Sequence, residues 1–148
     1  IMNRVGTSLL HEHNDKRLHI EGTILDFEEV NLEHLLKAVG GSLSPLRIPT
    51  DAGAVEVRDG EPCNGDPGKI QVFLYKIVNA YASQKDGFIY RQEKLDEPHS
   101  YLTSPYGNVP PGDCIIIEFD QEKEKTDKMC DSYEVALAQG KMKEVENG

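Results

Sequence analysis

The sequence has no tryptophan, few basic residues and no apolar run of membrane-spanning length. Without such a run, we expect no segment to cross a bilayer as a helix, and the first residues lack the cationic and apolar regions of a signal peptide. Only 16 lysines and arginines stand against 26 acids, a formal net charge of −10. This balance argues against a protein that binds nucleic acid by neutralising phosphates, and against docking on anionic membranes.

Cysteine is also scarce. Cys63, Cys114 and Cys130 are odd in number and widely separated. A disulfide framework normally uses an even number of cysteines, and a zinc site groups them in close pairs. The pattern therefore predicts three reduced thiols in a cytosolic setting. Cys114, which follows Asp113, is a candidate catalytic nucleophile, with a histidine distant in sequence as its base. A cysteine that opens an apolar strand is more often inert core, and we predict that role for it.

The length and composition indicate one folded domain. A chain of 148 residues with 38% apolar and 28% charged residues has enough material for a core and is not of the disordered type. We see no repeat and no domain boundary, so the prediction is a single domain over 1–148. Residues 59–68 combine three glycines, two prolines and three acids, which predicts a mobile exposed loop or turn cluster. The last eight residues, 141–148, are predicted to be frayed.

The most regular stretch runs from residue 17 to residue 41. Leu18 and Ile20 alternate with charged or polar neighbours, the period of a half-buried strand. The period then changes to one apolar helical stripe, which predicts a helix over about 31–39. Asn31 is a good N-cap and Gly40 a natural stop for this helix. The stripe consists of Leu32, Leu35, Leu36 and Val39.

Further strands follow from alternation and turn residues. They are expected near 4–10, 54–58, 69–80, 88–95 and 113–120, with 42–53 as loop or edge strand because of its prolines. The run 120–128 alternates in sign and is predicted to be solvated, and a possible C-terminal helix follows over about 129–137, capped by Thr126 or Asp127 and ended by Gly140. The fold class is mainly β (α+β), a β-sandwich or small barrel with one short flanking helix.

One group of histidines resembles a metal site. His11 and His13 would face the same way in a strand, as in cupin-type barrels, and His19 lies nearby. Such a site needs further ligands, for which Glu21 has the right parity and His99 is conceivable. The alternative is an exposed hairpin loop that contains two histidines by chance. We take this alternative, and predict no metal, no cofactor and no catalytic residue.

The sequence carries no catalytic signature. It contains no GxSxG, no HExxH and no phosphate-binding glycine loop of the GxGxxG or GxxxxGK[ST] type. Gly40 and Gly41 follow a helix and do not precede one, so they form a cap and not a phosphate cradle. The prediction is a protein that is not an enzyme.

The stretch GTILDFEEVNLEHLLKAVGG, residues 22–41, resembles a segment of the tail tube proteins of long-tailed bacteriophages. In that family an outer strand ends in an acidic passage into the single flanking helix. The later strands near 69–80, 88–95 and 113–120 follow in an order compatible with the second half of such a protein, whereas 121–148 has no counterpart. The matching residues are Ile24, Asp26, Phe27, Asn31, Leu32, Leu35, Leu36, Val39, Gly40 and Gly41.

The resemblance implies a non-enzymatic structural protein of a bacteriophage tail, found in the virion or the host cytoplasm. It would self-associate into rings or a tube and contact other virion or tail proteins. Tube proteins join sheet edges around a ring, and a surplus of carboxylates suits a lumen through which DNA slides without sticking. The strand near 69–80 is apolar on both faces, so we expect the assembly interface there, at Ile70, Val72, Phe73, Leu74, Tyr75 and Ile77.

Two other function classes stay open. One is a small acidic intracellular inhibitor or adaptor that binds a basic partner protein, for which binding should weaken steeply with salt. The other is a cupin-like metalloenzyme that uses His11 and His13.

Overall fold

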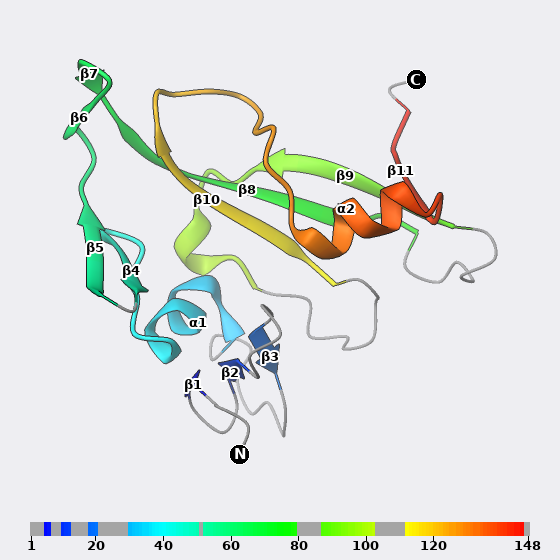
Figure 1. Cartoon of the computed structure of the whole chain (residues 1–148), viewed down its shortest axis with the longest axis horizontal. Coiled ribbons are helices and arrows are strands. Elements are labelled where there is room, and N and C mark those ends of the chain that lie inside the picture. Colours follow the sequence, from blue (N-terminus) through cyan, green and yellow to red (C-terminus); the bar gives the residue numbers. More distant parts are fainter. Residues whose placement is uncertain are drawn as a thin grey trace. The chain divides into compact units, whose positions relative to one another are not determined.

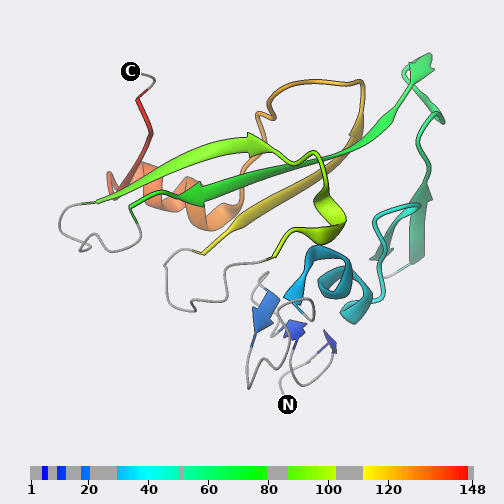
Figure 2. The same cartoon turned by 180° about the vertical axis from the view of Figure 1, so that it is seen from behind.

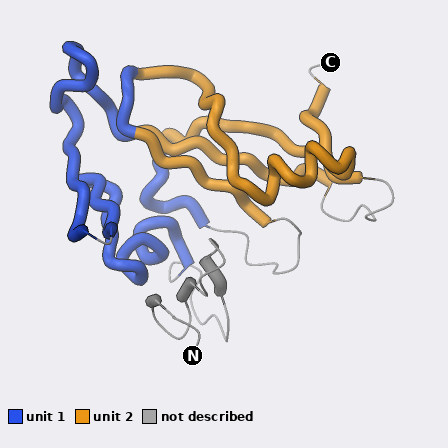
Figure 3. Tube along the Cα trace, viewed as in Figure 1, with its two compact units in different colours: residues 1–70, 97–105, 119–121 blue, residues 71–96, 106–118, 122–148 orange. Residues whose placement is uncertain are grey.

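The computed structural model describes residues 5–6, 10–12, 18–20, 30–50, 52–79, 87–102 and 112–146, with backbone alone up to residue 20. The chain divides into two compact units, shown in different colours in Figure 3. Unit 1 holds residues 1–70, 97–105 and 119–121, and unit 2 holds residues 71–96, 106–118 and 122–148. We describe each unit by itself, and the single domain over 1–148 stays a prediction.

The described residues are mainly β structure with two α-helices, which confirms the predicted fold class (Figure 1). No sheet in these described segments closes into a barrel, so that variant of the prediction is not found there. Unit 1 contains β1 (Val5–Gly6), β2 (Leu10–Glu12), β3 (Leu18–Ile20), α1 (Leu32–Ala38), β4 (Leu46–Thr50), β5 (Gly53–Val57), β6 (Pro62–Cys63), β7 (Asp66–Pro67) and the 3-10 helix η2 (Pro98–Ser100).

Unit 2 is built on a four-stranded sheet of order β10–β8–β9–β11. The strands β8 (Lys69–Ile77) and β10 (Cys114–Asp120) each have two residues assigned to unit 1, and β9 (Phe88–Lys94) lies wholly in unit 2. The predicted hairpin of β8 with β9 is confirmed, because the two strands are antiparallel. Helix α2 (Asp131–Ala138) and β11 (Met142–Glu144) complete the unit.

Helix α1 forms where the sequence places it, and its caps are those predicted. The Asn31 side chain accepts a hydrogen bond from the backbone N–H of His34 at 2.9 Å. At the other end Gly40 has a φ of +86°, which glycine adopts without steric cost. The N–H of Gly41 then donates to the carbonyl of Leu36 at 2.8 Å, the Schellman pattern that closes a helix.

One side chain closes the base of the β8–β9 hairpin. The Asn79 amide donates from Nδ2 to the carbonyl of Gly87 at 3.2 Å, and its Oδ1 accepts from the N–H of Ile89 at 2.7 Å. An asparagine side chain can therefore replace backbone pairing where the two strands separate into residues 80–86, which lie outside the described part.

The segment that links β10 to α2 lies against the sheet, and we call residues 122–130 the strap. Most charged side chains of this run are exposed, as predicted, but its backbone and the buried Thr126 are bonded to the sheet. The N–H of Thr126 donates to Gln92 Oε1 at 2.8 Å, and Gln92 Nε2 donates back to the Thr126 carbonyl at 3.0 Å. The N–H of Lys123 donates to Gln71 Oε1 at 2.8 Å. Sheet glutamines thus satisfy the strap backbone, a relation that charge alternation along the sequence does not reveal.

A charged group is buried beneath this strap. Glu118, on β10, has a side chain only 7% exposed and forms an ion pair with the Lys123 ammonium. The hydroxyl of Thr126 donates to the same carboxylate. Lys94 Nζ donates to the Lys123 carbonyl at 2.8 Å. A buried carboxylate requires such partners, and they in turn position the strap.

A disulfide joins β10 to the residue before α2. Cys114 and Cys130 are bonded, with their Cα atoms 5.8 Å apart, and Cys63 is free. The prediction of three reduced thiols is therefore wrong. The two cysteines are 16 positions apart, and folding brings them together because the strap turns back over the sheet. Sequence spacing alone does not contain that turn.

The last residues pair with the sheet, so the prediction of a frayed end over 141–148 is wrong for Met142–Glu144. This segment is β11, parallel to β9, and Met142 is buried. Gly140 ends α2 as predicted, with a φ of +70° and the N–H of Lys141 on the Ala136 carbonyl at 2.9 Å. The predicted side-chain cap is absent: Cys130 is the N-cap, without a side-chain hydrogen bond.

Helix α2 and the strap cover the same face of the sheet, as the two opposite views show (Figures 1 and 2). The core of unit 2 lies between this cover and the sheet. Its buried members are Tyr75, Ile77, Phe88, Tyr90, Cys114, Tyr133 and Met142, with Ile116, Met129, Cys130, Ala136 and Leu137 packed around them.

Candidate interaction surface

The six side chains expected to form the assembly interface, at residues 70–77, are not exposed to solvent as a surface. Strand β8 is an inner strand of its sheet, with β10 and β9 as its neighbours. Ile70 is half-buried, and the other five residues are buried within the chain. A second copy cannot reach these side chains without unfolding the sheet. The exposed fractions are 1% for Val72, 0% for Phe73, 0% for Leu74, 3% for Tyr75 and 7% for Ile77.

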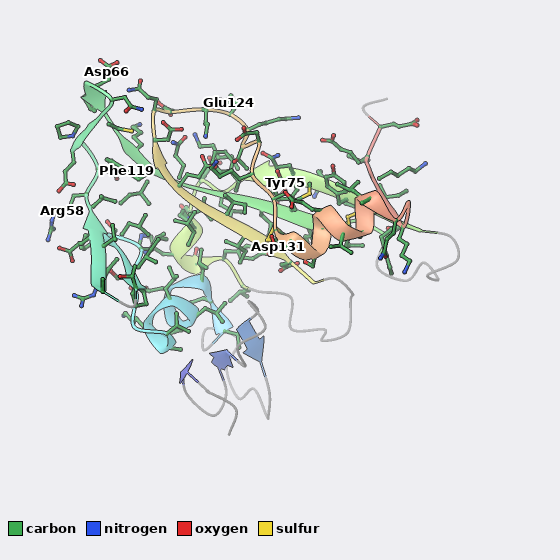
Figure 4. The ribbon with its side chains drawn as sticks, in the orientation of Figure 1. Arg58, Asp66, Tyr75, Phe119, Glu124 and Asp131 are labelled. Atoms are coloured by element: carbon green, nitrogen blue, oxygen red, sulfur yellow. A yellow bond between two sulfur atoms is a disulfide. The ribbon has the colours of Figure 1, made fainter. Side chains whose placement is uncertain are left out.

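Three tyrosines fill the centre of unit 2 (Figure 4 labels Tyr75). The ring centroids of Tyr75, Tyr90 and Tyr133 lie 5.8, 5.9 and 6.0 Å apart in the three pairs, at tilted or edge-on angles. The Tyr133 hydroxyl donates to the carbonyls of Tyr75 at 3.1 Å and Gly112 at 2.7 Å. The Tyr75 hydroxyl donates to the Lys128 carbonyl at 2.7 Å. These aromatic side chains therefore serve packing.

Burial keeps the cluster uncharged. It raises the pKa of Tyr133, with the Asp113 carboxylate adding to the effect. Burial also raises the pKa of Tyr75 and of Tyr90, and Glu144 raises both further. A phenol with a raised pKa stays protonated at neutral pH, so none of the three is poised to act as a base.

The candidate catalytic and metal-binding residues lie partly outside the described residues, and those that are described form no site. The interpretation of Cys114 as a nucleophile is wrong, because its sulfur is bonded to Cys130. His99 is exposed in η2. His13 and Glu21 lie outside the described residues. Within the described part of the chain, no group of three or more histidine, cysteine or carboxylate side chains could hold a metal ion.

The hairpin of β4 and β5 presents apolar side chains to solvent. In its register Leu46 lies opposite Val57 and Ile48 lies opposite Val55. These four residues share one face, and we call them the apolar ladder. Leu46 is buried at its base, but Ile48 is 44% exposed and Val55 is 56% exposed. Of the large exposed apolar residues in the described segments, only these two are direct cross-strand neighbours.

The opposite face of the same hairpin is polar or small. Arg47 lies opposite Glu56, and Pro49 lies opposite Ala54. The Arg58 guanidinium lies 3.7 Å from the Glu56 carboxylate. The hairpin is thus two-faced, as a strand pair is when one side is meant to be covered.

The two outer edges of this hairpin differ. On β4, Arg47 exchanges two backbone hydrogen bonds with Ser42, at 3.0 and 3.1 Å, whereas β5 has no partner besides β4 among the described strands. Pro49 removes one backbone donor from β4, whereas β5 contains no proline. An edge with its donors intact is a template for pairing with another strand. The sequence indicated these elements separately, as an edge strand and a short strand, and missed that their apolar residues line up. The available signal was the matched alternation of Leu46 and Ile48 with Val55 and Val57.

The glycine-rich segment 59–68 forms a short hairpin, β6 with β7. Its turn is Asn64-Gly65, with φ values of 55° and 93°, the conformation that asparagine and glycine favour in a tight hairpin. Asp59 Oδ1 accepts the N–H of Ile70 at 2.7 Å and ties the segment to the start of β8. The predicted turn cluster is therefore present, and its two arms pair as short strands. The predicted mobility of the segment stays a prediction.

Among the described residues, no helix has both the length and the apolar character needed to span a membrane. Comparison with known proteins finds no matching family model, no matching curated protein and no matching solved structure.

Proposed function

We propose that this protein is a non-enzymatic structural subunit that self-associates through the β4–β5 hairpin, in the manner of a bacteriophage tail tube or tail-associated virion protein. The observation that carries the proposal is the apolar ladder, with Ile48 and Val55 opposite each other and about half exposed. The family assignment rests on the resemblance over residues 22–41. The assembly surface rests on the hairpin.

An isolated two-stranded hairpin is marginally stable in water, and a third strand or a cover on its apolar face stabilises it. The outer part of the apolar ladder has no such cover among the described residues, since both its side chains remain exposed. Burial of the exposed parts of Ile48 and Val55 would add to the stability of an assembly. Among the strands whose side chains are described, the hairpin therefore has apolar surface to gain from a partner.

The hairpin also suits a second copy of the same chain. The surfaces that a second copy would use are the β5 edge and the apolar ladder, since the outer edge of β4 is partly occupied by the bridge between Ser42 and Arg47. If these surfaces meet a different surface of the next copy, the contacts are head-to-tail and build rings when the rotation closes and tubes or filaments when it does not. Arg47, Glu56 and Arg58 place both signs of charge on the hairpin, so the negative charge of the whole chain does not prevent copies from meeting there.

The excess of acids has a natural place in this proposal. A net charge of −10 makes the walls of a ring or tube repel the phosphates of nucleic acid. DNA would pass without binding, and no catalytic group or cofactor is required.

The experiment is light scattering over a range of protein concentrations, with negative-stain imaging of the concentrated sample. We expect the mass to rise with concentration, and rings or tubes of uniform diameter. Val55→Lys should abolish the rise because it places a charge within the apolar ladder. Ala54→Lys is the matched control: it is adjacent, exposed and on the opposite face. A wild-type protein that stays monomeric at the highest concentration, or equal loss in both variants, would overturn the proposal.

A second candidate function is an acidic adaptor or inhibitor that binds a basic protein. The observation in its favour is a set of exposed acids along the strap and α2, of which Figure 4 labels Glu124 and Asp131. Binding to polylysine that weakens steeply with added salt, and that Glu124→Lys with Asp131→Lys removes, would support it. The full set is Glu122, Glu124, Asp127, Asp131 and Glu134.

A further inference from the structure

The four-stranded sheet of unit 2 has a second face, opposite the one that α2 and the strap cover (Figure 2). The register shows which side chains it carries. Met142 and its partner Phe88 belong to the core, so the next partners along the two strands, Lys143 and Ile89, point to the second face. Two positions beyond Ile89, Arg91 points the same way.

This second face is basic. Lys76 is the cross-strand partner of Arg91, and two like charges directly opposite each other destabilise a strand pair. Glu93 lies 3.5 Å from the Arg91 guanidinium and offsets only one of the cations. Val78 adds an apolar side chain that is 44% exposed. We call this surface the basic face, and it consists of Lys76, Val78, Ile89, Arg91 and Lys143.

The outer side of helix α2 has the opposite charge. The helix contains no lysine or arginine. Four of its exposed residues follow the i, i+3, i+4, i+7 spacing of one helical stripe, and we call them the acidic stripe: Asp131, Glu134, Val135 and Ala138. The acidic stripe thus combines two carboxylates with an exposed valine, as the basic face combines cations with an exposed valine.

We propose that the acidic stripe of one copy docks on the basic face of the next copy. Opposite charges then meet around an apolar centre formed by Val135 and Val78. The sheet gains a helix on its second face, as it has one on the first. Like charges exclude the pairing of two basic faces or of two acidic stripes. Because the two surfaces differ, the contact is head-to-tail and repeats in a stack.

A contact the size of one helical stripe is weak, so its effect rests on the assembly proposed through the β4–β5 hairpin. Copies joined in a ring repeat the contact, and repeated weak contacts act together to stack rings into a tube. The net charge of −10 is compatible with stacking. At about 0.15 M salt, repulsion is screened beyond about 8 Å, whereas charges in contact are screened less.

The test uses two double variants. Arg91→Glu/Lys143→Glu reverses the basic face, and Asp131→Lys/Glu134→Lys reverses the acidic stripe. Negative-stain imaging at about 0.15 M salt should show tubes for the wild type and single rings for each variant, because like charges then face each other. Rings of the two variants mixed in equal amounts should stack again, since each reversed surface meets its complement.

The control is Lys125→Glu/Lys128→Glu. It makes the same charge change as the variant of the basic face, on exposed strap residues that belong to neither surface. It should form tubes like the wild type. If this control also loses tubes, or if the mixed variants do not stack, the proposal is overturned. Circular dichroism checks that each variant keeps the wild-type secondary structure.

Cross-linking separates the failure of this contact from the failure of the hairpin assembly. A carbodiimide joins a carboxylate to a lysine amine only where the two touch, and an equal mixture of isotopically labelled and unlabelled protein identifies links between copies. We expect links from Glu134 to Lys143 or Lys76 in the wild type, and also in Val55→Lys, which lacks the hairpin contact. These links without rings would overturn the proposed function alone. Rings without these links would overturn the stacking contact alone.

Discussion

The β8–β9 and β4–β5 hairpins have the same pairing and opposite environments. Each is antiparallel and has five residue pairs in register. The first is buried on the face that carries Phe73, Tyr75 and Ile77, whereas the second leaves most of its side chains exposed. Backbone pairing therefore does not decide how firmly a hairpin is held. The difference lies in what covers the face.

The β8–β9 hairpin has three kinds of cover within unit 2. Helix α2 supplies Tyr133 to the aromatic cluster, the strap supplies backbone groups to Gln92 and Gln71, and the disulfide fixes the start of the helix to β10. The β4–β5 hairpin has an apolar ladder that the described residues cover only at its base. This contrast is what makes the second hairpin the candidate for assembly, and it can be tested by removing one feature at a time.

The largest effect is expected from Phe73→Ala. Phe73 is fully buried, with the Lys94 ammonium 5.9 Å from its ring centroid. Truncation of a buried phenylalanine costs about 3–5 kcal/mol of stability. Ile48→Ala is the counterpart on the other hairpin and should cost about 0.5 kcal/mol or less in dilute protein. Urea unfolding with a constant m value measures both, and similar losses would refute the contrast.

Reduction of the disulfide comes next. The bond between Cys114 and Cys130 closes a short loop, and opening it should cost about 3 kcal/mol. The midpoint of urea unfolding should fall in a reducing buffer and in the Cys114→Ala/Cys130→Ala variant. Cys63→Ala should shift that midpoint far less, because Cys63 is not in the bond. A thiol titration that finds three reactive cysteines in the unreduced native protein would contradict the bond.

Alkaline pH should loosen unit 2 through its tyrosines. The pKa of Tyr75, Tyr90 and Tyr133 is raised in the folded chain, first by burial. The unfolded value is 10.0, so the stabilising contribution is complete below pH 10 and is lost as the pH rises toward the folded pKa values. Melting followed by circular dichroism should show this loss. Tyr133→Phe should flatten the fall above pH 10, and an unchanged slope would mean that Tyr133 does not contribute.

The smallest effect on stability is expected at the apolar ladder. Val55→Lys should change the unfolding free energy of the dilute monomer by about 0.5 kcal/mol or less, because Val55 is more than half exposed. The same variant should lose assembly, so stability and association separate. Its urea midpoint should match that of Ala54→Lys. A much lower midpoint for Val55→Lys would show that Val55 packs within its own chain and is not an assembly residue.

Local features were predictable where the causes are local. Asn31, the leucine stripe and Gly40 define α1 within a dozen residues. Apolar runs and turn residues likewise give three strands of the sheet, 69–77, 88–94 and 114–120. The candidate assembly surface was predictable only in part. Its two strands were expected, but the interface was assigned to β8, because a strand apolar on both faces can be an inner strand or an interface strand.

The amino-acid sequence determined the mainly β class, helix α1 with its two caps, and most of the longer strands, because periodicity, capping and turn residues act over a few positions. Only the tertiary structure decided the disulfide, the hydrogen bonds that join the strap to the sheet, the pairing of β11 and the exposure of the apolar ladder. Each of these depends on which segment covers or faces another across many residues. That choice is made by packing and hydrogen-bond satisfaction of the whole chain, which no local pattern contains.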